Sequence, residues 1–350
     1  MGGSALSGPG EGAGLRYLCT GGAGFLGSAI TAALLDKGHQ VTVLDDFSRG
    51  RPDRLAGLGC EAVEADVRNS WDVTQAAQGC DAIIHLAFVQ GTSVFYGEPR
   101  QVLDVAVRGM TSVVQACENT GIRELMLVSS SEAYEVPDVF PTPETTRLVV
   151  PDPLNPRFSY SGGKIISELM AVAWQRTGVL DRVMILRPHN IVGPDAGTGH
   201  VVPHFAQRMN RLARMPEYNG TVTVTQPIPF PIQGTGQETR SLCWIGDFVN
   251  QVMLVLEKSP AGTEIYHLGQ QDERTVEQIA RQVAACYNRE IKVVPGTLLK
   301  GSPNRRLPDT RKLRALGYLP EPVSFEETIR RTATWYQEHP YEENTDGVPG

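Results

Sequence analysis

The chain has 350 residues, a formal net charge of −7 at pH 7 and 41% hydrophobic residues, which is ordinary for a soluble globular protein with a sizeable core. The acidic balance argues against nucleic acid or an anionic membrane as the main partner, and no apolar run is long enough to span a bilayer. The six cysteines form no CxxC pair and have no histidines at zinc-ligand spacing, so we expect free thiols in a cytoplasmic protein and no metal site.

The chain begins with an irregular segment, which is followed by a strand–turn–helix–strand unit. Residues 1–14 are rich in Gly, Ala and Ser and have no hydrophobic period, so we expect them to be disordered. Tyr17–Cys19 predicts a buried strand, Phe25–Leu35 a helix, and Val41–Leu44 a second strand that ends at two carboxylates. Between the first strand and the helix lie the glycines Gly21, Gly22, Gly24 and Gly27.

This unit is typical of a dinucleotide-binding site. A tight turn requires a positive φ, and a pyrophosphate reaches the backbone only where no Cβ intrudes, which accounts for the glycines. The N-terminus of the helix offers free N–H groups to the phosphates. Asp45 lies about 20 residues further on, where a carboxylate accepts the ribose hydroxyls of NAD and repels the 2′-phosphate of NADP. We therefore predict NAD as the cofactor, although Arg49 and Arg51 favour a phosphate.

Strands and helices continue to alternate through the first half of the chain, which predicts an α/β fold with a Rossmann-type doubly wound parallel sheet. The expected strands are 60–64, 81–86, 124–129 and 182–187, and the expected helices are 70–77, 99–119 and 159–177. We assign residues 15–194, with parts of 241–269, to an NAD-binding domain. Residues 195–240 and 270–340 would form a smaller, discontinuous substrate-binding domain, and residues 341–350 a loose tail.

The second half of the chain has a less regular pattern. Its expected helices are 204–214, 244–258, 275–287, 310–316 and 324–338, and its expected strands are 265–269 and 291–294. Residues 221–236 are strand-like but rich in proline, and they would form an unusual wall of the substrate pocket.

A serine-rich strand end and a Tyr–Lys pair carry the expected chemistry. Tyr160 and Lys164 are four residues apart at the start of a predicted helix, so they share one helical face. We expect the ammonium of Lys164 to lower the pKa of the phenol, and a hydroxyl after the strand at 124–129 to bind the same substrate oxygen. These groups would move a proton at an alcohol while hydride passes to or from nicotinamide.

The chain resembles the extended short-chain dehydrogenase/reductases, and specifically the NAD-dependent epimerase/dehydratase family that acts on nucleotide sugars. The resemblance extends from about Arg16 to Tyr336. Its motifs are TGGAGFLGS (20–28), VLDDFSRG (43–50), LVSSSEAY (127–134), YSGGK (160–164), RPHNIVGP (187–194) and TRSLCWIGDFV (239–249). Two positions depart from the family pattern, because Glu135 replaces the usual glycine after Tyr134 and Ala106 replaces an asparagine.

The resemblance implies roles for individual residues. The cofactor-binding residues would be Gly21, Gly24, Phe25, Leu26, Gly27, Asp45, Asp46, Asp66, Val67, Leu86 and Ala87, together with Tyr160 and Lys164. The catalytic residues would be Ser130, Tyr160 as the base, Lys164 as its partner, and Glu132. The substrate-binding residues would be Ser131, Glu132, Asn190, His200, Arg240 and Arg306, with Lys300 and Arg305 as looser candidates for the diphosphate.

The resemblance also implies that reaction begins with oxidation of a sugar alcohol, usually at C4. We favour a nucleoside-diphosphate-sugar epimerase that acts at C4, because Ser131 replaces the aspartate that dehydratases place before Glu132. The alternatives are 3,5-type epimerisation, with some likeness to GDP-mannose 3,5-epimerase, and 4,6-dehydration, both through Glu132. His200 either forms an acid/base pair with Glu132 or is a solvated loop residue. The remaining alternative is that the protein is a non-catalytic regulator that binds NAD.

The expected partners are a nucleoside-diphosphate sugar and a second copy of the chain. The family resemblance implies a homodimer through the helices at 99–119 and 159–177. Val113, Val114 and Met170 either lie in that interface or face the sheet. The sequence leaves the nucleotide base and the sugar open.

Overall fold

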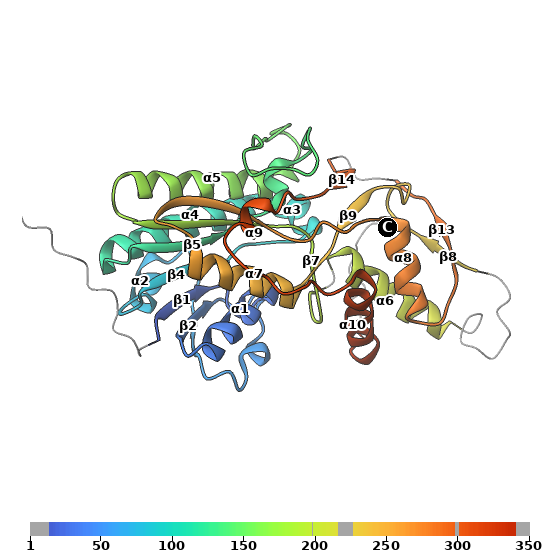
Figure 1. Ribbon diagram of the computed structural model, residues 1–350, viewed down its shortest axis with the longest axis horizontal. Helices are drawn as coiled ribbons and strands as arrows, with labels where there is room; N and C mark the ends of the chain where they lie inside the picture. Colours follow the sequence, from blue (N-terminus) through green and yellow to red (C-terminus); the bar gives the residue numbers. More distant parts are fainter. Residues whose placement is uncertain (1–13, 198, 216–226, 298–300, 341–350) are drawn as a thin grey trace, which may run out of the picture.

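The computed structural model describes residues 14–197, 199–215, 227–297 and 301–340 (Figure 1). Residues 1–13 of the segment predicted to be disordered (1–14), the tail at 341–350 and residues 221–226 of the strand-like stretch at 221–236 therefore lie outside the described residues.

A parallel sheet of seven strands forms the centre of the larger part of the molecule, in the order β11-β6-β5-β4-β1-β2-β3. The strands are β1 (Arg16–Thr20), β2 (Gln40–Asp45), β3 (Glu61–Glu64), β4 (Ala82–His85), β5 (Glu124–Val128), β6 (Arg182–Pro188) and β11 (Gly262–Leu268). The order reverses direction between β1 and β4, which is where ligands of such sheets bind. The predicted doubly wound α/β fold is thus confirmed.

Alternation along the strands creates a hydrophobic core on each face of the sheet. On β1, Tyr17 and Cys19 belong to one core and Leu18 belongs to the other, as the two-residue period of a strand requires. In Figure 1, α1 (Phe25–Asp36) and α7 (Ile245–Lys258) cover one face. The other face is covered by α2 (Ser70–Ala76), α4 (Pro99–Thr120) and α5 (Phe158–Arg176).

The side chains of Val113 and Val114 are fully buried in the core beneath α4. Met170 of α5 packs against the same core and is only partly exposed. Of the two alternatives for these three residues, the sheet-facing one is therefore correct. These side chains are hydrophobic because they pack within one chain, and not because they form a contact surface for a second copy.

A third hydrophobic core lies in the smaller part of the molecule, at the right of Figure 1. It is built by α6 (Val201–Arg214), α8 (Val276–Ala285), α10 (Phe325–Glu338), β8 (Ile228–Pro231) and β13 (Ile291–Val294). Helix α6 begins three residues before the predicted start, because Pro203 fits the first turn of a helix, where no N–H partner is needed.

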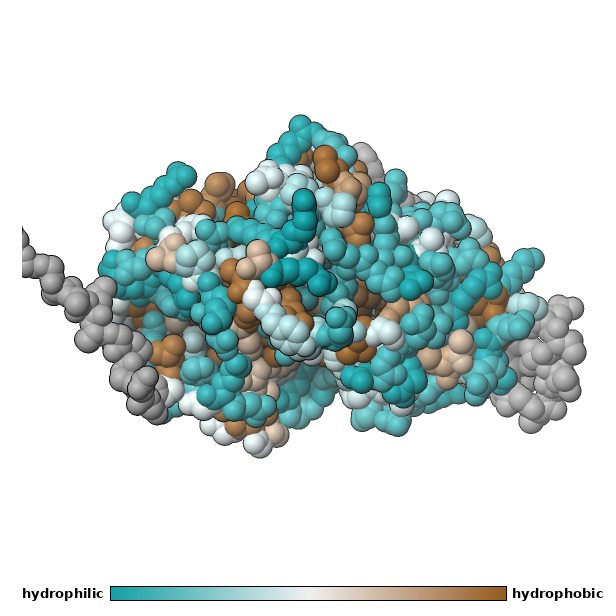
Figure 2. Space-filling model, viewed as in Figure 1, coloured by the Kyte–Doolittle hydropathy of each residue, from teal (hydrophilic) through white to brown (hydrophobic). Residues whose placement is uncertain are grey.

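The remaining helices and strands of the described residues are short. They are α3 (Thr92–Gly97), β7 (Ile191–Val192), β9 (Thr239–Ser241), β10 (Cys243–Trp244), β12 (Glu273–Thr275), β14 (Arg305–Arg306) and α9 (Arg311–Arg314). The face drawn in Figure 2 is mostly hydrophilic, with hydrophobic residues in small groups. Among the described residues, every helix is too short or too polar to cross a membrane.

The turn between β1 and α1 is packed backbone against backbone. Gly21 has φ +73, and a Cβ there would lie 2.6 Å from the backbone nitrogen of Ala87. A Cβ at Gly27 would lie 2.3 Å from the carbonyl oxygen of Gly21. Real Cβ atoms do not approach backbone this closely, so both positions require glycine.

We predict that Gly27→Ala destabilises the protein by about 2 kcal/mol or more, because a methyl group must displace the turn backbone rather than a movable side chain. Gly97→Ala is the matched control, since a Cβ at this helical glycine meets no atom within 4 Å. It should be neutral or slightly stabilising. Urea unfolding measures both variants, and equal stability of the two would contradict the packing described here.

Candidate active site

One cavity of about 360 Å³ lies at the carboxyl ends of the central strands. Most of the predicted site residues line it, although they come from positions far apart in the sequence. They are Gly21, Gly24, Phe25, Leu26, Gly27, Asp45, Asp46, Asp66, Val67, Leu86, Ala87, Ser130, Ser131, Glu132, Tyr160, Lys164, Asn190 and His200. Arg240 and Arg306 are not among the lining residues. The fold thus brings the glycine turn, the serine-rich strand end and the Tyr–Lys helix to one place.

The glycine end of the cavity fits a dinucleotide. Gly24 is the N-cap residue before α1 and has no side chain, so the first N–H groups of the helix have no side-chain acceptor at that position. Asp45 ends β2 and accepts hydrogen bonds from the backbone N–H groups of Ala23 and Phe47, each at 3.0 Å. A Cβ at Gly50 would lie 2.5 Å from the Asp45 carboxylate. The turn and this fixed carboxylate suit a pyrophosphate and a ribose.

Two arginines near this end of the cavity form ion pairs with carboxylates of the protein. Arg51 forms ion pairs with Asp53 at 2.5 Å and with Asp195 at 2.9 Å. Arg54 binds the same Asp195 at 2.7 Å. Because these guanidiniums are neutralised by carboxylates, Arg51 is poorly suited to a 2′-phosphate. Arg49 lines the cavity instead, and this residue was not predicted as part of the site.

Tyr160 lies in an aromatic pocket at the start of α5. Its ring stacks on Phe95 of α3 with centroids 4.7 Å apart, and the edge contact with Phe88 is at 5.2 Å. Burial raises the pKa of Tyr160 to about 12, although a hydrogen bond with Ser130 acts in the opposite direction. Ser130 and Tyr160 are therefore close enough to hold one substrate oxygen between them.

The contacts of Lys164 differ from those expected of a residue that activates the phenol of Tyr160. Its ammonium donates to the carbonyl oxygen of Val128 at 2.8 Å and lies 3.8 Å from the ring centroid of Phe88. Burial lowers the pKa of Lys164 to about 7, so the lysine itself is close to losing its charge at neutral pH. The predicted lowering of the Tyr160 pKa by Lys164 is wrong for this arrangement, because desolvation dominates the phenol.

Two arginines hold Glu132 at the wall of the cavity. Arg306 of β14 forms an ion pair with its carboxylate at 2.9 Å and donates to the carbonyl oxygen of Ser131 at 2.5 Å. Arg157, which directly precedes α5, approaches the other carboxylate oxygen at 3.3 Å. Arg157 was not predicted as part of the site, because it lies outside every motif of the sequence. Arg306 therefore binds Glu132 without lining the cavity itself. Its predicted contact with a substrate stays a prediction.

Arg240 lies next to this group in β9. Its guanidinium donates to the carbonyl oxygens of Thr239 at 2.7 Å and Pro303 at 2.9 Å. Burial lowers the pKa of Arg240 to about 10, and Arg306 acts in the same direction. The predicted contact between Arg240 and a diphosphate likewise stays a prediction.

Glu135 is buried beside the same turn although it was noted only as a departure from the family pattern. Its backbone has φ 55 and ψ −101, a conformation that L residues rarely adopt. Such a conformation costs on the order of 1–3 kcal/mol and is concentrated at functional sites. Burial raises the pKa of Glu135 to about 7, and a hydrogen bond from Ser161 opposes this shift.

Asn190, between β6 and β7, and His200, directly before α6, line the cavity as well. Asn190 has φ 45, and its side-chain amide donates to the carbonyl oxygen of Ser241 at 3.1 Å, which fixes its orientation. Burial lowers the pKa of His200, helped by the charge of Arg49 and opposed by Glu132. A neutral imidazole in the same cavity as Glu132 is consistent with the acid/base pair, which stays a prediction.

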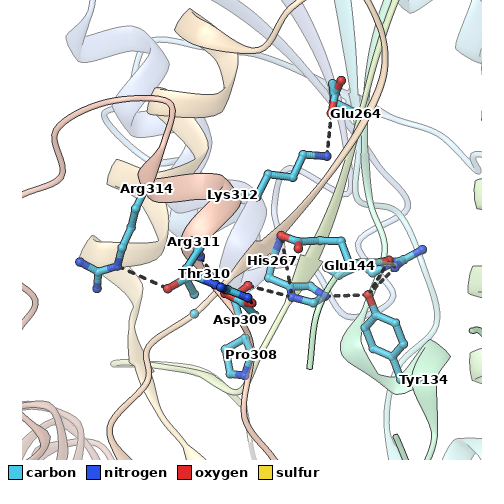
Figure 3. A network of polar contacts seen from close by, with 12 residues as sticks. Tyr134, Glu144, Glu264, His267, Pro308, Asp309, Thr310, Arg311, Lys312 and Arg314 are labelled. Carbon is cyan, nitrogen blue, oxygen red and sulfur yellow. Dashed lines mark hydrogen bonds and ion pairs between the residues drawn. The ribbon is translucent and has the colours of Figure 1, made fainter. Parts of the chain in front are cut away.

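A buried polar network joins α5 to the carboxyl ends of β5 and β6. Arg187 of β6 binds Glu168 of α5 at 2.5 Å, and Ser129 donates to the same carboxylate at 2.5 Å. Arg187 also donates to the hydroxyl oxygen of Tyr134. The hydroxyl oxygen of Tyr134 lies 2.7 Å from Nε2 of His267 (Figure 3), so that the network extends to the C-terminal segment.

His267 links that network to the segment before α9. Its Nδ1 lies 3.1 Å from the carbonyl oxygen of Asp309 (Figure 3). Burial lowers the pKa of His267 to about 3, so the ring is neutral, with Nδ1–H donating to Asp309 and Nε2 accepting from Tyr134. These bonds fix β5, β6, β11 and α5 relative to one another, and thereby fix Ser130 and Tyr160.

We predict that Glu168→Gln lowers the free energy of unfolding by about 3–5 kcal/mol, because it leaves the guanidinium of Arg187 buried without its counter-charge. Glu257→Gln is the matched control. It breaks the exposed pair with Lys37, whose side chains are 46% and 50% exposed, and should cost at most about 1 kcal/mol. Similar losses in the two variants would contradict the role given to the network.

Three comparisons place the chain among known proteins. The sequence profile of the NAD dependent epimerase/dehydratase family matches residues 17–269. UDP-glucuronic acid decarboxylase 1 of Xenopus tropicalis is 28% identical over 339 residues, which cover 95% of this chain and 75% of that protein. Solved structures resemble the whole fold as well.

Two solved structures were obtained with NAD. UDP-glucose 4-epimerase of Thermus thermophilus in complex with NAD is 26% identical, with a TM-score of 0.75 and coverage of 92% of this chain and 99% of that one. dTDP-glucose 4,6-dehydratase of Streptomyces venezuelae with NAD bound is 28% identical, with a TM-score of 0.78 and coverage of 93% and 97%. The relatives therefore share a cofactor but differ in the reaction that their names give.

Proposed function

Because this chain belongs to the NAD-dependent epimerase/dehydratase family, we propose that it oxidises the 4-hydroxyl of a nucleoside-diphosphate sugar and then completes an epimerisation at C4. The observation that carries the proposal is the meeting of Ser130 and Tyr160 with the glycine turn in a single cavity. NAD, held by the glycine turn and Asp45, would accept and return the hydride.

The residues around the alcohol would have separate roles in proton transfer. Ser130 would hold the reacting oxygen, and Tyr160 would take its proton as the C–H bond is broken. The phenolate needs stabilisation because burial holds the pKa of Tyr160 near 12. Stacking on Phe95 fixes the phenol in place, so that little reorganisation is required when the proton moves. Lys164 would hold the nicotinamide ribose beside this group.

The ion pairs of Glu132 favour simple epimerisation at C4. Removal of a carbon-bound proton beside a ketone requires a carboxylate oxygen that is free to approach the C–H bond, whereas each carboxylate oxygen of Glu132 is engaged in an ion pair, one with Arg306 and the other with Arg157. Such a carboxylate is better suited to bind a sugar hydroxyl and orient the ring. Return of the hydride to the opposite face of the 4-keto sugar then needs only Tyr160 as proton donor.

Decarboxylation is a second candidate, and the arginines behind Glu132 are the observation that favours it. A sugar that carries a carboxylate at C5 becomes a β-keto acid once C4 is oxidised, and it then loses CO2 without removal of a carbon-bound proton. Arg157, Arg306 and Arg240 together exceed the charge of Glu132, and although none of the three lines the cavity, their positive charge behind Glu132 would favour an acidic sugar. The names of several relatives describe decarboxylases of uronic-acid nucleotides.

We also propose that the protein acts in the cytoplasm as a homodimer through α4 and α5. Leu103 and Val107 of α4, together with Ile166 and Leu169 of α5, are exposed hydrophobic residues on these helices. They replace Val113 and Val114, which face the sheet, as the side chains suited to such a contact.

Tyr160→Phe should lower kcat about 10²- to 10⁴-fold, because it removes the proton acceptor but keeps the ring that packs on Phe95. Retention of NAD by the purified variant should be unchanged. Tyr318→Phe, at a side chain that is 84% exposed, is the control and should match the wild type. A Tyr160→Phe enzyme with wild-type kcat would remove the phenol from the mechanism.

The reaction itself is tested with a panel of UDP-, GDP-, dTDP- and CDP-sugars, including uronic acids, in D2O, with products identified by NMR. We expect a C4 epimer without carbon-bound deuterium, and Glu132→Gln should largely retain this activity. Carbon-bound deuterium would contradict simple epimerisation, and with loss of CO2 it would establish the second candidate. Reduction of bound NAD by none of the sugars would favour a non-catalytic regulator.

A further inference from the structure

The ammonium of Lys164 is buried without a carboxylate partner of its own. The residue is only 4% exposed, and among the residues that the structure describes no ion pair joins it to an acidic side chain. Glu168 lies one turn further along α5, but both of its carboxylate oxygens bind the guanidinium of Arg187. Because a buried charge is costly unless other groups stabilise it, the groups that do contact Lys164 decide whether it stays charged.

Phe88 presents the face of its ring to this ammonium. The nitrogen lies 3.8 Å from the ring centroid of Phe88 and 5.8 Å from that of Tyr160. The face of an aromatic ring is electron-rich, and its attraction for a cation is strongest where water is excluded. A second contact is the hydrogen bond to the carbonyl oxygen of Val128 at 2.8 Å. One ring face and one carbonyl oxygen thus stabilise a charge that has no counter-ion of its own among the described residues.

Small residues make room for the ring of Phe88. A Cβ at Gly163 of α5 would lie 3.1 Å from Cζ of Phe88 and 2.8 Å from Cβ of Ala106 on α4. Glycine at position 163 therefore leaves the space that the ring occupies, and Ala106, a departure from the family pattern, belongs to the same packing. On its other side the ring makes an edge contact with Tyr160, with the ring planes at 82°. Phe88 lines the cavity, and the proposed reaction gives it no role.

We propose that Phe88 is a positioning residue for Lys164: the face of its ring keeps the buried ammonium charged and holds it beside the ring of Tyr160. The proposal deepens the proposed function, and it rests on that function only where Lys164 is assigned to the nicotinamide ribose. A protonated lysine has three N–H donors, of which one binds Val128. Since a ring face is not an oxygen acceptor, it stabilises the charge and leaves donors for the hydroxyls of a ribose. An uncharged amine would bind them more weakly.

The pH dependence of this charge follows from its burial. Burial lowers the pKa of Lys164 from 10.5 to about 7, and the charge of Glu168 acts in the opposite direction. Two other titratable groups face the ammonium, and neither changes its charge between pH 5.5 and pH 9: burial raises the pKa of Tyr160 on α5 to about 12 and lowers that of His85 on β4 to about 3. Because the folded-state pKa of Lys164 is lowered, its charge costs stability below about pH 7, and the protein gains stability as the pH rises from about 7 to 10.5.

The first test needs neither substrate nor cofactor. Urea unfolding of the wild type, Phe88→Leu, Lys164→Met and the double variant is measured at pH 5.5 and pH 9. At pH 5.5, Phe88→Leu should destabilise the wild type more than it destabilises Lys164→Met, because only the wild type loses support for a charge. For a tenfold loss in the proton affinity of Lys164, the two effects should differ by roughly eightfold in the unfolding equilibrium constant. At pH 9 the lysine is neutral, and the difference should vanish.

The matched control is Phe95→Leu, which removes a ring that stacks on Tyr160 rather than on the ammonium. Its cost should be the same in both backgrounds and at both pH values. Phe88→Tyr keeps a ring face and should retain most of the coupling, and Phe88→Met replaces Phe88→Leu if leucine is not tolerated. Additive effects of Phe88→Leu and Lys164→Met at pH 5.5 would overturn the proposal. Equal coupling at both pH values would indicate packing alone and would overturn it as well.

The second test measures the Kd of NAD by isothermal titration, with full-length protein freed of bound NAD. If NAD needs Lys164 in its charged form, Phe88→Leu should raise the Kd roughly ninefold at pH 8 and little at pH 5.5, for the same tenfold loss in proton affinity. An equal loss of affinity at both pH values would indicate a merely structural contact and overturn the proposal. If neither protein binds NAD, the proposed function fails, whereas the unfolding experiment still decides the role of Phe88.

Discussion

The site depends on the contact of Gly27 with the turn at Gly21, where even a single methyl group has no room. This contact brings the first turn of α1 against the carboxyl end of β1, and the free N–H groups of the helix then face the cavity. Every other feature of the site is arranged relative to that helix terminus. Asp45 lies on one side of it, and the strand end with Ser130 lies on the other.

A second constraint is a buried polar network that fixes the elements carrying Ser130 and Tyr160. The pair of Arg187 and Glu168 joins β6 to α5, and Tyr134 and His267 extend the network to β11 and the segment before α9. A network of buried charges is costly unless each member is paired, and here the pairing crosses four elements. The network provides a rigid support for Ser130 and Tyr160, which the proposed proton transfer requires in one geometry.

Much of the fold and most of the site follow from local sequence patterns. Hydrophobic alternation and the spacing of the glycines predicted the strands, the main helices and the cofactor, and 18 of the predicted residues line the cavity. Lys164 was assigned the wrong electrostatic effect, because its spacing from Tyr160 says nothing about the carbonyl oxygen of Val128 that binds its ammonium. Arg157 lies three residues before the YSGGK motif and outside it, and only the tertiary structure brings its guanidinium to Glu132. The reaction that follows oxidation is not encoded in the shared motifs either, since relatives with the same fold have names that describe epimerases, dehydratases and decarboxylases.

The central claim is that Tyr160 removes the proton of a sugar alcohol while hydride moves to NAD in the same cavity. The most direct measurement is rapid mixing of the NAD-loaded protein with nucleotide sugars while the absorbance of reduced nicotinamide is recorded. The account predicts a transient rise in reduced nicotinamide for the wild type with at least one nucleotide sugar, and none for Tyr160→Phe. The same rise in both proteins, or its absence in the wild type with every sugar although NAD is bound, would contradict it.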